Sequence, residues 1–270
     1  MSVIAGWIRE HRLTTFVGLA FLVSWWSWPF YELGMAPTPF FACGPLIAAL
    51  TVLGVTEGVS GYRSLGARMI RWRVGWSWWA VAVGLPLAVL GVATTANVAV
   101  WGAPAPVLAD LAWTGLAVNL GLRFVNPLDG ALGEEPGWRG YAVPQLQRRR
   151  SPLASAVLLG VIVAVWHLPL VAAGQLAAIG LVVTFAITPV YVWLFNHTGG
   201  SVLLTMVFHV VQGTFSMAAL GFTGEDAARM DWLTGALWCL IAAGLVIGDR
   251  KAWQRAPAAA VAPPGEPVRL

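Results

Sequence analysis

Long apolar runs are the feature that most limits how this chain can fold. A helix needs about 20 predominantly apolar residues to cross roughly 30 Å of hydrocarbon, and eight segments approach that length. These segments are Leu13–Tyr31, Phe40–Thr56, Trp78–Trp101, Val107–Val125, Leu153–Ala173, Ala177–Phe195, Ser201–Leu220 and Trp232–Ile247. Charged residues make up 10% of the chain, against about 25% in soluble domains. We therefore expect an all-α, polytopic membrane helix bundle of about eight transmembrane helices.

Clusters of basic residues predict how the bundle is oriented. Cytoplasmic loops accumulate Arg and Lys, and here the basic residues fall on alternate connections between apolar runs. The clusters are Arg9 and Arg12, then Arg63, Arg68, Arg71 and Arg73, then Arg148, Arg149 and Arg150, then Arg250, Lys251 and Arg255. We expect both termini in the cytoplasm and membrane lipid around the helices. Because no basic face could follow a phosphate backbone, a nucleic-acid partner is not expected.

The apolar runs follow one another without a linker, so residues 1–256 are expected to form one transmembrane domain. Residues 257–270 are rich in Ala and Pro, a composition typical of a disordered tail, which we expect on the cytoplasmic side. Cys43 and Cys239 both lie inside apolar stretches and do not indicate a disulfide framework.

Charges inside membrane spans are rare and costly, so they indicate functional sites. The richest segment is Gly133–Gln147, in which Pro136 suits a first helical turn and predicts a helix starting near Gly133. Glu135 and Arg139 are then four residues apart and can pair on one face. Glu134 points about 100° away and is left as a carboxylate suited to general-base work. The structural alternative is a pair of carboxylates that cap a helix N-terminus.

Two histidines, His167 and His209, lie deep in predicted spans. Taken alone, each would more often be a packed core residue than a ligand. At about 1.5 Å per helical residue, Glu134 and His167 each lie roughly 20 Å from the Arg148 cluster. With the same rise per residue, His209 lies roughly 15 Å from the connection at Gly199. The three side chains therefore fall in one layer of the membrane, as a shared site requires.

Motifs of several other membrane proteases are absent from the sequence. It contains no His-Glu-x-x-His zinc motif, no Gly-x-Ser-Gly serine site and no Gly-x-Gly-Asp aspartyl site. Ser201 and His209 share a helix and lie about 12 Å apart along it, too far for a nucleophile and its base. His11 and His197 lie at span ends and are expected to be interface residues.

The motifs that are present resemble those of the CPBP family, also called Abi, which includes CAAX prenyl endopeptidases. Its motifs are Glu-Glu-x-x-x-Arg, Phe-x-x-x-His and His-x-x-x-Asn or Asp. They match here at Glu134-Glu135-x-x-x-Arg139, at His167 and at His209, within a motif-bearing core of residues 132–213. The resemblance implies an intramembrane endopeptidase of a bacterial plasma membrane, with a peptide or protein as substrate. We expect its water-filled cavity to open toward the cytoplasm.

Catalytic roles follow from the resemblance for Glu134, Glu135, Arg139, His167 and His209. Glu134 would activate a water for attack on a peptide carbonyl, His167 would hold that water, and His209 would stabilise the oxyanion. Glu135 and Arg139 would form a buried pair that holds the helix in place. The family is often labelled a metalloprotease, and Glu134, His167 and His209 make a candidate zinc set. Metal-free activation of water would use the same residues.

Two positions depart from the family pattern. Val163 stands at the Phe position of the second motif, and Gly213 stands at the Asn or Asp position of the third, where the family places a side chain near the scissile carbonyl. Gln212, the preceding residue, is a candidate to supply the missing polar side chain. The departure at Gly213 favours an alternative reading: a non-catalytic immunity or membrane-scaffold protein that binds a peptide or protein without cleaving it. A small-solute transporter is less favoured, because no inverted repeat is visible.

Overall fold

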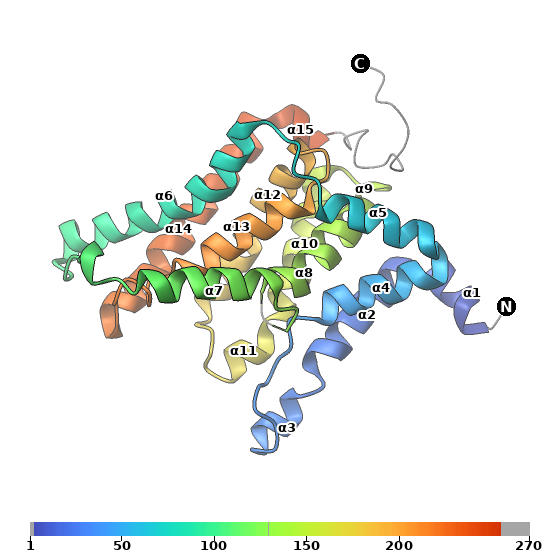
Figure 1. Ribbon diagram of the computed structural model, residues 1–270, viewed down its shortest axis with the longest axis horizontal. Helices are drawn as coiled ribbons and strands as arrows, with labels where there is room; N and C mark the ends of the chain where they lie inside the picture. Colours follow the sequence, from blue (N-terminus) through green and yellow to red (C-terminus); the bar gives the residue numbers. More distant parts are fainter. Residues whose placement is uncertain (1–2, 129, 255–270) are drawn as a thin grey trace.

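The computed structural model describes residues 3–128 and 130–254, and this part of the chain contains helices and no strand. The first half comprises α1 (Val3–Glu10), α2 (Arg12–Trp25), α3 (Trp28–Glu32), α4 (Gly44–Thr56), α5 (Val59–Met69), α6 (Trp76–Trp101), the 3-10 helix η1 (Leu108–Asp110) and α7 (Trp113–Val125). The second half comprises α8 (Ala131–Gly137), the π-helix η2 (Trp138–Ala142), α9 (Val143–Gln147), α10 (Pro152–Trp166), α11 (Leu168–Ala172), α12 (Ile179–His197), α13 (Val202–Thr214), α14 (Gly224–Gly248) and α15 (Arg250–Gln254). Figure 1 shows their arrangement. The expected all-α fold is confirmed, while the predicted tail at 257–270 lies outside the described residues.

Every predicted span contains a helix, but several helix ends differ from the prediction. Among the described residues, five segments are long and apolar enough to cross a membrane, and α4 and α13 are shorter apolar helices. The fourth span begins as a helix only at Trp113, because η1 and an extended segment precede α7. The helix of the last predicted span, α14, begins earlier than predicted, at Gly224. Its first turn carries Glu225 and Asp226, which the helix dipole favours at an N-terminus.

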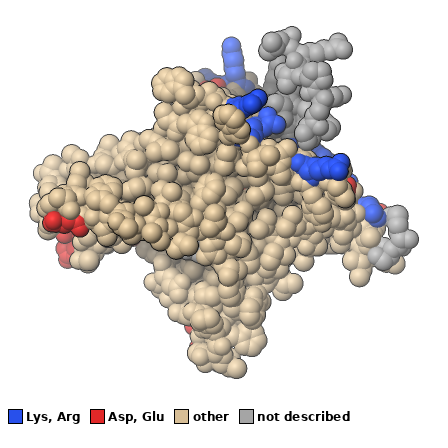
Figure 2. Space-filling view, in the orientation of Figure 1, with Lys and Arg blue, Asp and Glu red and all other residues tan. Residues whose placement is uncertain are grey.

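The outside of the bundle is apolar over most of its surface. In each of the five long spans, only 17% to 50% of the most apolar 18-residue stretch is buried inside the protein. At least half of each stretch therefore faces outward. In Figure 2 basic side chains gather at one end of the molecule, over α5 and near α15, and acidic ones gather at the far end of α6 and α14. Such a surface suits lipid rather than water, and the chain is an integral, multi-pass membrane protein.

The segment α8–η2–α9 lies at the centre of the fold, between α4 and α13. Its glycines allow backbones to approach closely, because a Cβ at Gly133 would overlap the carbonyl of Ala42 and one at Gly137 the carbonyl of Pro45. Small residues of this kind let membrane helices pack without a side chain between them. Trp138, on η2, is fully buried against Phe16 and Trp166. The motif segment is therefore held on several sides.

Pro136 accounts for the change of helix type within this segment. Proline has no N–H to donate and its ring crowds the carbonyl four residues earlier, and the chain winds as a π-helix directly afterwards, at Trp138–Ala142. Short π-helical turns inside α-helices are frequent at functional sites. The carbonyl of Gly140 in this turn accepts a hydrogen bond from Arg68 Nη1 at 2.7 Å. Arg68 on α5 thus ties the basic end of the molecule to the motif segment.

Candidate active site

The paired glutamates lie on α8, and the structure separates them as the sequence predicts. Glu135 is fully buried, and its Oε1 accepts a hydrogen bond from Arg139 Nη1 at 2.9 Å. The guanidinium of Arg139 also lies over the ring of Tyr191, 3.9 Å from its centroid, at a distance typical of a cation–π contact. Glu134 takes no part in this pair and lines a cavity instead. The predicted Glu135–Arg139 pair is confirmed as a contact.

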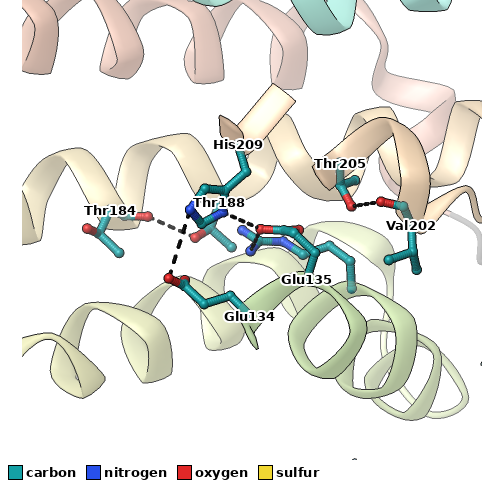
Figure 3. A network of polar contacts seen from close by, with 8 residues as sticks. Glu134, Glu135, Thr184, Thr188, Val202, Thr205 and His209 are labelled. Carbon is teal, nitrogen blue, oxygen red and sulfur yellow. Dashed lines mark hydrogen bonds and ion pairs between the residues drawn. The ribbon is translucent and has the colours of Figure 1, made fainter. Parts of the chain in front are cut away.

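His209 on α13 joins the two glutamates (Figure 3). Its Nδ1 lies 2.9 Å from Glu135 Oε1, and its Nε2 lies 3.9 Å from Glu134 Oε1. Because a carboxylate only accepts hydrogen bonds, Nδ1 is the donor toward Glu135. This bond fixes the ring so that Nε2 faces Glu134. Glu135 therefore orients a histidine in addition to pairing with Arg139, a second contact that sequence spacing did not predict.

His167 lies at the junction of α10 and α11, next to Pro169. Its Nδ1 donates to the carbonyl oxygen of Val163 at 2.8 Å, since a carbonyl can only accept. The ring stacks on Phe40, with centroids 5.9 Å apart and planes inclined by 25°. Val163 stands at the Phe position of the motif and provides no aromatic ring. The aromatic neighbour of His167 is instead Phe40, from the connection between α3 and α4.

A cavity of about 760 Å³ brings the predicted residues together. Glu134, Arg139, His167 and His209 all line it, whereas Glu135 lies behind them. Tyr191 and Arg123 line it as well. Tyr191 had no signal in the sequence beyond its place in an apolar span, whereas Arg123 stands out there as a charge in the fourth predicted span, a candidate for hydrogen bonding between helices.

The cavity reaches the end of the bundle that lacks the arginine clusters. Among its lining residues, those outside helices come from the connections α3–α4, α7–α8, α11–α12 and α13–α14 and from the α10–α11 junction at His167. No residue of the described basic connections at 57–75 or 147–151 lines it. The expected opening toward the cytoplasm stays a prediction, because nothing in the structure fixes which end of the bundle is cytoplasmic. If the arginine-rich connections are cytoplasmic, the lining places the cavity nearer the opposite end.

The candidate zinc set was tested against this geometry. In the part of the chain that the structure describes, no three His, Cys, Asp or Glu side chains are grouped so that they could hold a metal ion together. The Nδ1 contacts of His209 to Glu135 and of His167 to Val163 do not by themselves oppose metal binding, because a metal-bound histidine also makes such a contact with its second ring nitrogen. The arrangement of the three side chains as a group is what fails to match. As arranged here, Glu134, His167 and His209 do not fit a three-ligand zinc site.

Ser201 and His197, which the sequence also singles out, have structural partners. Ser201 caps α13 by accepting from Leu204 N, and its hydroxyl donates to the carbonyl of Arg71 at 2.7 Å. His197 lies 3.0 Å from a carboxylate oxygen of Asp249 near the basic end. Gln212 lines the cavity beside Gly213. These contacts agree with a structural reading of Ser201 and His197.

Comparison with known proteins supports the motif assignment. Residues 112–215 match the family model described as "Type II CAAX prenyl endopeptidase Rce1-like". The chain is also similar to CAAX prenyl protease 2 of Methanococcus maripaludis, 30% identical over 130 residues that cover 44% of this chain and 46% of the relative. The chain thus spans about half the length of the curated relative it matches. The resemblance to the CPBP family is therefore confirmed, and it is carried by the segment that holds Glu134, Glu135, Arg139, His167 and His209.

Proposed function

We propose that this protein is an intramembrane endopeptidase that hydrolyses peptide bonds with a water activated by Glu134. The observation that carries the proposal is the placement of Glu134 3.9 Å from His209 Nε2 in a cavity within the bundle. The similarity of residues 112–215 to CAAX prenyl endopeptidases supports it. Peptide hydrolysis within a bilayer requires such a cavity, because water and peptide backbone must be admitted away from lipid.

The reaction can be written with residues of this chain alone. Glu134 accepts a proton from water, the water oxygen adds to the peptide carbonyl carbon, and the carbonyl oxygen becomes an oxyanion. Glu134 then passes the proton to the leaving amine as the C–N bond breaks. His167, whose Nδ1 is engaged by Val163, presents Nε2 as an acceptor for the second hydrogen of the water.

His209 stabilises the oxyanion in this proposal. Its Nδ1 hydrogen is directed to Glu135, and the ring lies between two carboxylates, an arrangement that favours the imidazolium form by Coulombic attraction. An imidazolium Nε2–H then donates to the oxygen that gains negative charge. A positioned donor of this kind typically lowers the barrier by about 3 to 4 kcal/mol.

Substrate and orientation belong to the proposal as well. With the basic connections in the cytoplasm, both termini are cytoplasmic and the cavity opens toward the opposite face of the plasma membrane. We propose that the substrate is a peptide or protein segment that reaches the cavity from that face, between the α3–α4 and α11–α12 connections, both of which line the cavity.

The test compares N- and C-termini of membrane proteins in cells that carry the wild-type protein or Glu134→Gln at matched levels. Glu10→Gln is the control, because Glu10 is an exposed carboxylate on α1. We expect new termini with the wild type and the control that disappear with Glu134→Gln. Identical termini in all three cells, with each protein folded, would contradict the proposal.

A non-catalytic binding protein of the same fold is the second candidate, and Gly213 favours it because α13 offers no side chain there. Under that reading the termini are identical, yet a membrane protein is retained by both wild type and Glu134→Gln in detergent pull-down experiments.

A further inference from the structure

A carboxylate outside the catalytic cluster also lines the cavity. Asp231 on α14 lines it together with Thr234 and Trp238, and their spacing of three and four residues places all three on one face of the helix. Asp231 is half-buried. The residues that α6 contributes to the same lining are apolar: Pro86, Val89 and Leu90. The reaction proposed above uses no group of α14, so it does not account for this charge.

The carboxylate of Asp231 has no partner among the described residues. It makes neither a hydrogen bond nor an ion pair within that part of the chain. Arg229 is the nearest basic residue along α14, but residues two apart on a helix do not face each other. Arg229 pairs instead with Asp226 and donates from Nε to Asn97 Oδ1 on α6 at 3.1 Å. The protein thus commits its nearest cation elsewhere.

The place of Asp231 in α14 does not account for its charge either. The helix begins at Gly224, so Asp231 lies about 10 Å from the helix N-terminus along the axis. The helix dipole favours carboxylates in the first turn, where Glu225 and Asp226 lie, and its effect falls off beyond that turn. A charge inside a membrane span is costly and indicates a function when the fold does not require it.

Packing of α14 on α13 gives a first value for the distance between Asp231 and the catalytic cluster. The ring of Trp238 packs against the ring of Phe208, with centroids 5.8 Å apart, and Phe208 is the residue before His209. Asp231 precedes Trp238 by seven residues, or about 10 Å along α14. The carboxylate therefore lies well outside hydrogen-bonding distance of His209.

Packing of α14 on α12, which runs beside it in the same direction, gives a larger value. A Cβ at Gly235 would lie 3.4 Å from Val183 Cγ2. Val183 precedes Tyr191 by eight residues, or about 12 Å, and the ring of Tyr191 lies 6.2 Å from that of His209. Asp231 lies one further turn before Gly235, so the separation is between about 10 and 18 Å. An extended peptide covers this distance with about three to five residues.

We infer that Asp231 binds a cationic nitrogen of the substrate, about three to five residues from the peptide bond that is cleaved. This contact rests on the endopeptidase function proposed above, to which it adds a residue that selects substrates. A carboxylate binds an ammonium or guanidinium group through charge-assisted hydrogen bonds. The nitrogen belongs either to a Lys or Arg side chain or to the amino terminus of the peptide.

The probes are fluorescent apolar peptides in which a phosphinic group, an analogue of the tetrahedral intermediate, replaces the central peptide bond. One position, moved from one to seven residues from that group on either side, carries Lys, norleucine or Glu, and the amino terminus is acetylated. A further set has norleucine there and a free amino terminus at the same distances. Binding to the full-length protein in detergent is measured by anisotropy.

Asp231→Asn removes the charge and keeps the size of the side chain. Asp110→Asn is the matched control, because Asp110 is an exposed carboxylate on η1 that does not line the cavity. We expect the wild type to bind a cationic peptide about 10- to 100-fold more tightly than its norleucine counterpart, the effect of a charge-assisted hydrogen bond. The preference should appear three to five residues from the phosphinic group, disappear in Asp231→Asn and remain in Asp110→Asn.

The two sources of the nitrogen are separated by which peptide shows the preference, the one with Lys or the one with a free amino terminus. Wild-type protein that prefers neither over norleucine, or prefers them only next to the phosphinic group, would overturn the inference. So would Asp231→Asn that keeps the preference. Asp231→Lys should reverse the preference, so that the peptide with Glu binds more tightly than the one with Lys.

Thermal stability separates this role from a structural one. Asp231→Asn removes a costly charge from a span, so we expect its melting temperature in detergent to equal or exceed that of the wild type. A lower melting temperature would assign Asp231 to the fold and contradict the inference. Glu134→Gln should keep the preference for the cationic peptide. Cleavage retained by Glu134→Gln, with that preference intact, would instead contradict the proposed reaction.

Discussion

His209 Nδ1 and Glu135 Oε1 are joined by a 2.9 Å hydrogen bond across 74 residues of sequence. The same carboxylate oxygen also accepts a hydrogen bond from Arg139. One buried oxygen of Glu135 therefore contacts Arg139 in the next helical turn and His209 on α13. The bond couples folding to the candidate chemistry, because whatever displaces Glu135 also turns His209 away from Glu134.

Glu135→Ala should therefore impair both folding and activity. It leaves Arg139 as a buried charge without its carboxylate, a change that typically costs about 3 to 5 kcal/mol, and it frees the ring of His209. We expect a lower melting temperature in detergent together with loss of cleavage. Arg139→Ala should lower the melting temperature in the same way, and normal thermal stability of both variants would contradict the structural role of the pair.

Metal removal should leave the activity intact. The described residues offer no three-ligand set, and Glu134, His167 and His209 can activate water and stabilise an oxyanion by hydrogen bonding alone. We expect purified protein treated with a zinc chelator to retain its cleavage rate and its melting temperature. Loss of activity on chelation, restored by added Zn²⁺ and accompanied by about one zinc per chain in elemental analysis, would show that these side chains rearrange around a metal.

Gly137→Ala should prevent α8 from docking on α4. The added methyl group would overlap the carbonyl and side chain of Pro45, and such overpacking typically costs about 1 to 3 kcal/mol, or more where backbone itself must move. We expect little folded protein by size-exclusion chromatography. Gly121→Ala is the matched control: a Cβ at Gly121 meets nothing within 4 Å, and alanine stabilises a helix by up to about 1 kcal/mol.

The face on which the cavity opens can be tested with single cysteines in a protein whose Cys43 and Cys239 are replaced by alanine. Gln175 is exposed and lines the cavity, and Arg149 is exposed at the basic end. In intact cells a membrane-impermeant maleimide should label Gln175→Cys and not Arg149→Cys. Labelling of Arg149→Cys alone would reverse the proposed orientation.

Much of this molecule could be predicted from the sequence because its causes are local. Apolar runs of about 20 residues require membrane helices, and the spacing of Glu135 and Arg139 places them on one helical face. The common depth of Glu134, His167 and His209 follows from the rise of a helix, and all three line one cavity.

The sequence by itself determined the helical fold and the helix positions of the candidate site residues, because helix geometry relates each residue to its neighbours along the chain. The tertiary structure decided which partners these residues meet. Packing of α8 on α13 directs His209 toward Glu135, and the lack of a side chain at Gly213 leaves room for Arg123 from α7. Packing also leaves the cavity away from the described basic connections at 57–75 and 147–151. Such contacts join residues far apart in sequence, and they depend on which helix surfaces fit together rather than on periodicity within any one helix.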